Sequence, residues 1–282
     1  MGGILQAIVV GVVIVLVGSM ARNLLWTANL HVFTAVPWAI LAIAIFLYFF
    51  WRYLNGAGPP PETSLYRRMS LRANRLPLNV WVASLIAGGL GLFALVLALR
   101  VANRMVVLPE QPLPDLSAIP QVTVLSLLIA GAPVAGIIEE AAFRGYMQVP
   151  IEKRYGLVVA ILITGTMFAL VHLDFTPVLW PYYVAVAAIY GTVTYLTNSI
   201  LPAIVLHTAG NIYSNLDLWM RGRAEWQAAK GPAELIWQTG ADSSFWFASV
   251  ALALVTALAI AAYLYLARIA GPLVREPLAA AR

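Results

Sequence analysis

Long apolar runs, separated by short polar connections, dominate the chain. A membrane-spanning helix needs about 20 predominantly apolar residues. The pattern predicts eight such helices, the fourth long and the seventh short: Ile4–Met20, Phe33–Trp51, Val80–Leu99, Val122–Pro150, Leu157–Leu173, Val178–Leu196, Ile200–Tyr213 and Phe245–Ala267. We therefore expect an all-α fold, a polytopic transmembrane helical bundle of about eight spans. Ile4–Met20 has no basic segment before it, so we expect it to be a retained span and not a signal peptide.

The composition supports this fold class. The chain is 62% hydrophobic and 10% charged, with a mean hydropathy of +0.85, whereas a soluble domain carries about 25% charged residues. It contains no cysteine, which excludes disulfides, thiolate nucleophiles and Cys-ligated metal centres. The net charge of +5 comes from basic residues that flank the apolar runs. They form no separate basic domain, so we expect no nucleic-acid partner and contact instead with the lipid bilayer.

Basic residues also predict the orientation, because cytoplasmic loops are enriched in them. The connection between the second and third spans carries Arg52, Arg67, Arg68, Arg72 and Arg75 against Glu62. This loop should be cytoplasmic, and alternation then places both termini, with Arg268 and Arg275, on the same side. Arg22 alone favours the opposite sense, because it follows the first span with no charge ahead of it.

The longest connection, Ser214–Ser244, contains Trp219, Trp226 and Trp237 among mixed charges. Tryptophans of this kind are typical of a segment anchored at the membrane interface. A role in gating a substrate is the alternative.

Two adjacent carboxylates interrupt the fourth span. Glu140 and Arg144 are four residues apart, so on a helix they share a face and can form an ion pair. Glu139 lies about 100° away around the helix and has no basic partner one turn on. It is therefore the freer carboxylate and the better candidate for a general base. The alternative is that both glutamates simply end a helix at the cytoplasmic interface.

Two further polar clusters lie in later spans. Phe168 and His172 are one turn apart in the fifth, and Asp174 is near enough in sequence to orient the imidazole. In the seventh, His207, Asn211 and Asn215 repeat every four residues, a pattern that could also serve as hydrogen-bonding contacts between helices. Ionisable groups at membrane depth cost about 2.5–3.5 kcal/mol each and usually mark function. We therefore expect the three clusters to form one site.

The expected depths of the three clusters in the membrane argue against a single site. Counting 1.5 Å per residue from the expected cytoplasmic loops places Glu139, His172 and His207 at depths that differ by about 15 Å. A bundle of ideal, straight helices would not bring them together, whereas helix tilt, a broken helix or misplaced helix ends could close the gap.

In this order and setting, Glu139-Glu140 with Arg144, Phe168 with His172, and His207 with Asn211 resemble the motifs of the CPBP family. This family comprises CAAX proteases and bacteriocin-processing enzymes, also called Abi. Gly145, directly after the arginine, also fits the family pattern. The resemblance covers about Val122 to Tyr213.

The resemblance implies an endopeptidase that hydrolyses a peptide bond within or at the membrane. Glu139 with His172 would activate a water, His207 and Asn211 would bind the oxyanion, and Glu140 with Arg144 and Phe168 would support them. The substrate would be a membrane protein or a lipidated, CAAX-like peptide. Together with the span pattern and the loop charges, it predicts three regions: spans in 1–120 with the basic loop, a catalytic core in 121–215, and an extracytoplasmic Trp-rich loop with a final span in 216–282.

We expect no cofactor. Zinc is the alternative, with Glu139, His172 and His207 as ligands, although the HExxH arrangement of zinc proteases is absent. Two other functions stay open: a catalytically idle immunity or scaffold protein, and a transporter with a buried ionisable relay. The alanine-rich, lysine-poor composition favours a prokaryotic plasma membrane.

Overall fold

A computed structural model describes residues 2–109, 115–172, 176–222, 226–227 and 234–279, with the side chains described as far as Gly271. Within these residues the fold is all-α and contains no strand, as the sequence predicts. Each of the eight apolar segments forms a helix. The larger elements are α1 (Gly2–His31), α2 (Ala39–Leu54), α3 (Ser64–Leu71), α4 (Leu78–Met105), α5 (Gln121–Glu139), α6 (Gln148–Tyr155), α7 (Leu157–Val171), α8 (Trp180–Thr197), α9 (Leu201–Arg221) and α11 (Ser243–Ala279).

The smaller elements lie between them. Two are 3₁₀ turns, at Pro61–Thr63 and Pro177–Leu179, and α10 is the single turn Ile236–Thr239. The segment Glu140–Met147 is a π-helix, which joins α5 to α6 without a break.

Four stretches are long and apolar enough to cross a membrane: Gly3–His31, Leu78–Met105, Gln121–Tyr155 and Ser243–Gly271. Ala39–Leu54 and Leu157–Val171 are shorter apolar helices. The bundle of apolar helices is thus confirmed. The count of eight spans and the three-region division stay predictions.

Several predicted boundaries are wrong. The first helix runs to His31, well past Met20, because Arg22 does not end it: the guanidinium lies 5.5 Å from the ring centroid of Trp26 on the same helix. Phe33 lies in the turn that follows and not in the second span. The seventh segment is not short, since α9 continues through its polar residues to Arg221. Leu173 and Asp174, and the side chain of Arg275, lie outside the described residues.

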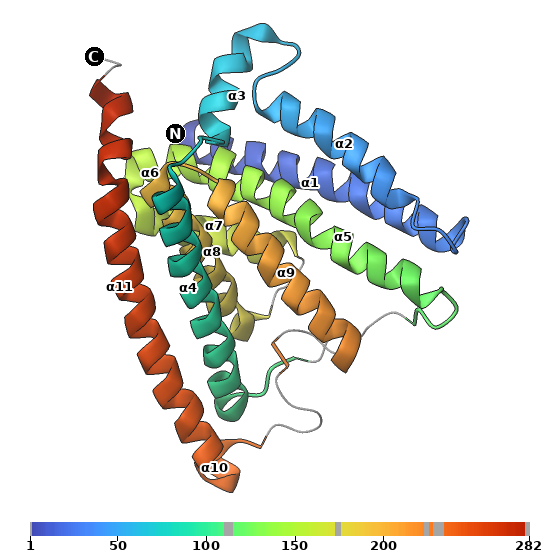
Figure 1. The fold of residues 1–282 in the computed structure, drawn as a ribbon, viewed down its shortest axis with the longest axis vertical. Coiled ribbons are helices and arrows are strands. Elements are labelled where there is room, and N and C mark those ends of the chain that lie inside the picture. The colour runs from blue at the N-terminus through green and yellow to red at the C-terminus, as the bar shows by residue number, and fades with distance from the viewer. Residues whose placement is uncertain (1, 110–114, 173–175, 223–225, 228–233, 280–282) are drawn as a thin grey trace.

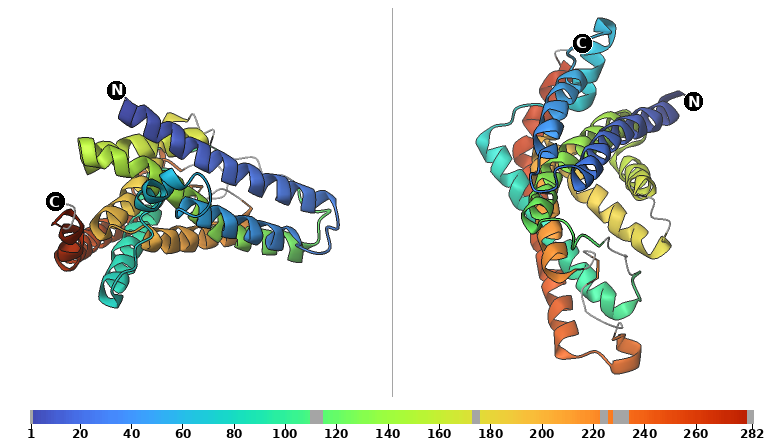
Figure 2. Two further views of the ribbon diagram at one scale, coloured as in Figure 1. Left: turned by 90° about the horizontal axis from the view of Figure 1, so that it is seen from above. Right: turned by 90° about the vertical axis from the view of Figure 1, so that its right-hand side faces the viewer.

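The helices form two sets that cross at an angle (Figures 1 and 2). Helices α4 and α11 run antiparallel as one pair, joined by a small cluster in which Val80, Ala83 and Ala87 meet Leu266 and Ala270. Helices α1, α2, α5 and α9 run at an angle to that pair. The π-helix packs against α1, α3, α7, α8 and α9.

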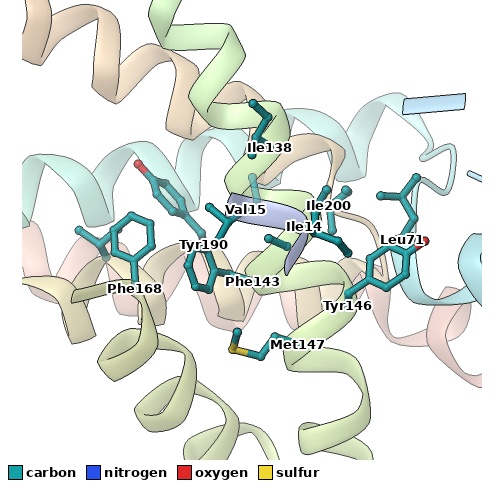
Figure 3. Close-up of a cluster of buried hydrophobic side chains, with 14 of the residues drawn as sticks. Ile14, Val15, Leu71, Ile138, Phe143, Tyr146, Met147, Phe168, Tyr190 and Ile200 are labelled. Carbon is teal, nitrogen blue, oxygen red and sulfur yellow. The ribbon is translucent and has the colours of Figure 1, made fainter. Parts of the chain in front are cut away.

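The main apolar core surrounds the π-helix (Figure 3). Phe143, Tyr146 and Met147 point into it and meet side chains from α1, α3, α7, α8 and the start of α9. Phe143 and Met147 are fully buried. Because close-packed interiors resist displacement, this core fixes the position of the carboxylates that precede Phe143 along the chain.

Polar contacts hold the connections at one end of the bundle. Buried Arg67 donates to the carbonyl oxygens of Tyr53, Ala57 and Gly58, which closes the loop between α2 and α3. Arg72 is paired with buried Glu152 of α6. This end of the molecule, formed by α3, the start of α4 and α6, is called the basic end below.

Candidate active site

Helices α5 and α9 approach closely, and a glycine makes the approach possible. A Cβ atom on Gly136 would lie 2.7 Å from Oγ1 of Thr208 and 3.1 Å from the carbonyl oxygen of Ile204. Real side chains do not tolerate the first of these distances, so only glycine fits without displacement. The contact sets Glu139 and Glu140, one turn further along, against His207 of α9.

Glu140, Arg144 and His207 form a buried charged cluster. Nδ1 of His207 lies 2.7 Å from Oε1 of Glu140, and Nη1 of Arg144 lies 3.3 Å from the same oxygen. Glu140 and Arg144 are 0% exposed and His207 is 4% exposed. The predicted pairing of Glu140 with Arg144 is therefore present. A carboxylate can only accept, so Nδ1 of His207 carries the hydrogen in this contact.

The π-helix is part of this geometry. Sequence reasoning assumed a regular α-helix at Glu140–Met147, whereas the structure has a π-helix there. Such segments are rare and occur frequently at functional sites. Gly145 belongs to it, and a Cβ there would lie 3.1 Å from the carbonyl oxygen of Ser70 in α3. The small residue after Arg144 thus lets α3 pack directly against the segment.

Glu139 is the less constrained of the two glutamates. Its Oε2 lies 3.8 Å from Nε2 of His207, a longer separation than that between His207 and Glu140. Unlike Glu140, it lines the cavity described below and keeps 7% of its surface exposed. The division into one held and one freer carboxylate agrees with the sequence prediction.

His172 approaches the same region from α7. Its Nδ1 lies 2.7 Å from the carbonyl oxygen of Phe168. A carbonyl only accepts, so Nδ1–H donates and Nε2 of the neutral ring is left as an acceptor. The Phe168 carbonyl therefore orients the ring. The expected orienting residue, Asp174, lies outside the described residues.

Aromatic rings separate and hold these groups. The ring of Phe168 lies 4.6 Å from that of His172 and 6.3 Å from that of His207. Tyr190 of α8 stacks on His207 with centroids 5.0 Å apart and planes at 13°. The Arg144 guanidinium lies 5.3 Å from the centroids of both Phe168 and Tyr190, within range of a cation–π attraction. Figure 3 shows Phe168 and Tyr190 on the same side of the π-helix.

A cavity of about 2220 Å³ reaches these groups. Glu139, His172, His207 and Asn211 all line it, as do aromatic residues of α8. Glu140 and Arg144 do not line it and lie behind the wall. The structure thus brings the four residues predicted to be catalytic to one cavity.

The polar stripe of α9 serves two purposes. Asn211 faces the cavity beside His207. Nδ2 of Asn215, one turn further, donates to the carbonyl oxygen of Leu128 in α5 at 2.7 Å. For Asn215, the polar side chain therefore serves as a hydrogen-bonding contact between helices, one of the two interpretations that the sequence allowed.

The depth expectation is wrong. Glu139 and His207 lie 3.8 Å apart at their nearest charged atoms, and Phe168 bridges His207 and His172. The expected depths in the membrane assumed that all spans are straight and parallel to the membrane normal. The two sets of helices instead cross at an angle (Figure 2), so residues at different distances along their helices meet.

The zinc alternative stays a prediction. Within the described residues, no group of three His, Cys, Asp or Glu side chains is placed to hold a metal ion. His207 directs Nδ1 at Glu140 and His172 directs Nδ1 at the Phe168 carbonyl, so each ring keeps Nε2 for another contact.

Sequence reasoning missed the tyrosines of α8. Tyr183, whose ring centroid lies 5.7 Å from that of His172, and Tyr190, stacked on His207, are seven residues apart and thus share one helix face. That spacing is visible in the sequence. It is equally typical of an ordinary core face, so it could not have identified a site by itself.

Residues 121–213 match the family model described as type II CAAX prenyl endopeptidase Rce1-like. The matched residues begin with α5 and end within α9, and so contain all the site residues named above. No curated protein and no solved structure matches the chain.

Proposed function

We propose that this chain, whose residues 121–213 match the Rce1-like family of type II CAAX prenyl endopeptidases, is an endopeptidase that works within the membrane without a cofactor. The match and the apolar helices support an integral membrane protein of CAAX-protease type. The proposed substrate is a membrane-associated protein or peptide, with a lipidated, CAAX-like chain as one candidate. The observation that carries the proposal is the charged cluster of Glu139, Glu140, Arg144 and His207 at a cavity.

Glu139 and His172 would activate the water. Both line the cavity, and each presents a group that accepts a hydrogen: a carboxylate, and Nε2 of a ring whose Nδ1 faces a carbonyl. As the water oxygen bonds to the scissile carbonyl carbon, its proton passes to Glu139. The same proton then goes to the departing amine nitrogen while the C–N bond breaks. The products are a carboxyl terminus and an amine, and Glu139 is again a carboxylate.

His207 and Asn211 would stabilise the oxyanion of the tetrahedral intermediate. Both project from α9 into the cavity one turn apart. With Nδ1–H directed at Glu140, the ring donates from Nε2 only when it carries both protons. Donors held in advance where negative charge develops give the largest single contribution in many enzymes.

Glu140 and Arg144 would act through His207. The sequence resemblance gave this pair the task of supporting the catalytic residues. The observed contact is with Nδ1 of His207, at 2.7 Å from Glu140. We therefore assign Glu140 as a positioning residue for the imidazole, and Arg144 as the residue that holds Glu140 in place.

A cleavage assay tests the proposal. Purified protein, reconstituted in liposomes, is incubated with a panel of fluorogenic CAAX-type and general peptides, and products are identified by mass. We expect wild type and Glu62→Ala, a change at an exposed loop residue, to cleave at the same bond. Glu139→Ala should lose at least about 10²-fold in rate, the typical contribution of a general base. Equal cleavage by Glu139→Ala and wild type would refute the proposal.

A further inference from the structure

Buried polar side chains follow one another at every fourth residue through the π-helix and α6: Glu140, Arg144, Gln148 and Glu152. Glu140 and Arg144 belong to the charged cluster beside the cavity. Gln148 and Glu152 lie beyond that cluster, toward the basic end, and have no part in the proposed mechanism. A buried polar group costs free energy unless it has a partner, so the contacts of these two residues indicate their purpose.

Gln148 and Glu152 connect α6 to α8 and to the end of α3. Nε2 of Gln148 donates to Oε2 of Glu152 at 2.9 Å and to the carbonyl oxygen of Gly191 in α8 at 3.0 Å. The other carboxylate oxygen of Glu152 is paired with Arg72, the residue that follows α3. Arg72, Glu152 and Gln148 thus form a second set of buried polar contacts, which we call the basic-end network.

A glycine in α8 makes the contact with Gln148 possible. A Cβ atom on Gly191 would lie 2.8 Å from Oε1 of Gln148, so the amide would have to move. The neighbouring residue, Tyr190, is the one that stacks on His207. The basic-end network therefore holds α8 at the turn that carries the ring beside this imidazole.

The backbone of Arg72 also holds the start of α9. The backbone N–H of Ile200, directly before α9, donates to the carbonyl oxygen of Arg72 at 3.0 Å. Oγ of Ser199 donates to the carbonyl oxygen of Asn74 at 2.7 Å, which repeats the link between the same two segments. The segment after α3 thus fixes the start of α9, about two turns before His207.

The backbone conformation of Arg72 is one that glycine or asparagine usually adopts. Its φ is 54°, in the left-handed region, and it ends α3. Glycine is common at such helix ends because the Cβ atom of other residues is crowded there. An arginine in this conformation, with its charge buried, therefore indicates that its side-chain contacts outweigh the crowding.

We infer that Arg72 is a positioning residue for the imidazole of His207. Its ion pair with Glu152 fixes the π-helix against α8, and its carbonyl group fixes the start of α9. These elements carry the charged cluster, Tyr190 and His207. The inference rests on the proposed function for the role of this imidazole in catalysis. Because Arg72 lies outside the matched residues 121–213, the N-terminal region contributes to the arrangement of the site.

The energetics of buried ion pairs separate positioning from stability. The desolvation of two charges offsets much of their attraction, so replacement of both partners by apolar side chains of similar volume is often neutral or stabilising. If the pair of Arg72 and Glu152 serves to arrange the helices, its replacement should impair the site while the protein stays folded.

The test replaces both charged partners at once. The full-length double variant Arg72→Met/Glu152→Met is compared with wild type in thermal unfolding, in kcat and KM on one peptide, and in NMR of isotopically labelled histidine rings. The chain has only three histidines, and the variants His31→Gln and His172→Gln assign their signals. Arg75→Met, at an exposed arginine of the same connection, is the matched control.

We expect the double variant to stay folded and to shift the ring-nitrogen signals of His207, whose Nδ1 faces Glu140. The signals of His31, at the exposed end of α1, should not move. kcat should fall by up to about 10²-fold, the effect of a misplacement of about 1 Å, with KM within a few-fold of wild type. Arg75→Met should match wild type in every measurement.

Gly191→Ala disturbs the same network without removing a charge. The added Cβ displaces the amide of Gln148, so the His207 signals should shift and kcat should fall, as in the double variant. Gly271→Ala is the matched control, because a Cβ there meets nothing within 4 Å. It should leave the His207 signals and kcat unchanged.

His207 signals at their wild-type positions in the folded double variant, or a wild-type kcat, would overturn the inference. If the double variant does not fold, Gly191→Ala decides by the same two measurements. A shift of the His207 signals, together with no cleavage by wild type, would refute the proposed function and still support the link between Arg72 and His207. The two failures are therefore distinguishable.

Discussion

Nδ1 of His207 lies 2.7 Å from Oε1 of Glu140, and both side chains are buried. Nη1 of Arg144 lies 3.3 Å from the same oxygen. One carboxylate oxygen thus links a permanent cation to an imidazole at the cavity wall. A buried charge is stable only while it is paired and hydrogen-bonded, so this cluster should behave as a unit.

Removal of the Arg144 guanidinium tests whether Glu140, Arg144 and His207 depend on one another. Arg144→Met should lower the free energy of unfolding by about 3–5 kcal/mol, because it leaves Glu140 buried without its partner. Thermal unfolding of the purified protein in detergent measures the change. Arg154→Met, on an exposed residue, is the matched control and should alter stability by less than about 0.5 kcal/mol. Equal stability of the two variants would show that Glu140 does not depend on Arg144.

Asn211 and Asn215 of α9 should have different roles, one in catalysis and one in stability. Asn211→Leu removes a proposed oxyanion donor and should lower kcat by about 10²–10³-fold while stability changes little. Asn215→Leu removes the hydrogen bond to the Leu128 carbonyl and should cost about 1 kcal/mol of stability. Its kcat should stay within a few-fold of wild type. The reverse assignment of the two effects would contradict the geometry.

Tyr190 provides a flat surface for both His207 and Arg144. Tyr190→Phe keeps the ring and should retain most of the activity. Tyr190→Leu loses the stacking and should reduce kcat by about tenfold, in line with the 0.5–2 kcal/mol of a partly desolvated cation–π contact. kcat of the three proteins on the same peptide checks this, and equal rates for the leucine variant and wild type would contradict it.

The close approach of α5 and α9 depends on Gly136. Gly136→Ala would place a Cβ against Thr208 and the backbone of Ile204, and the separation of the helices should reduce both stability and kcat. Gly89→Ala is the matched control, since a Cβ there meets nothing within 4 Å. Relative to glycine in a helix interior, alanine is favourable by up to about 1 kcal/mol. The control should therefore be neutral or stabilising, and a loss of stability in both variants would contradict the account.

The long apolar runs were sufficient to predict the fold class and the approximate positions of the helices. The lengths of the helices were less predictable, because each predicted helix was ended at the first charged or polar residues after an apolar run. Arg22 on α1 and the polar residues after Tyr213 on α9 continue their helices, since each finds a ring, a carbonyl or an acid as a partner.

The pairing of Glu140 with Arg144 was predictable because it depends only on local spacing. The contact between Glu140 and His207 was not, because it depends on how α5 crosses α9 and on the π-helix. Tyr190 was missed for the same reason: stacking on a residue of another helix leaves no mark in the sequence.

The central claim is that Glu139 activates water without a metal ion, and the most direct measurement is kcat before and after exhaustive chelation. Wild type, Glu139→Gln and His172→Ala are compared on the same peptide, with each sample then given zinc. The account predicts that wild-type kcat is unchanged by chelation and by zinc, and that both variants stay inactive throughout. Loss of wild-type activity on chelation, with recovery on addition of zinc, would contradict it.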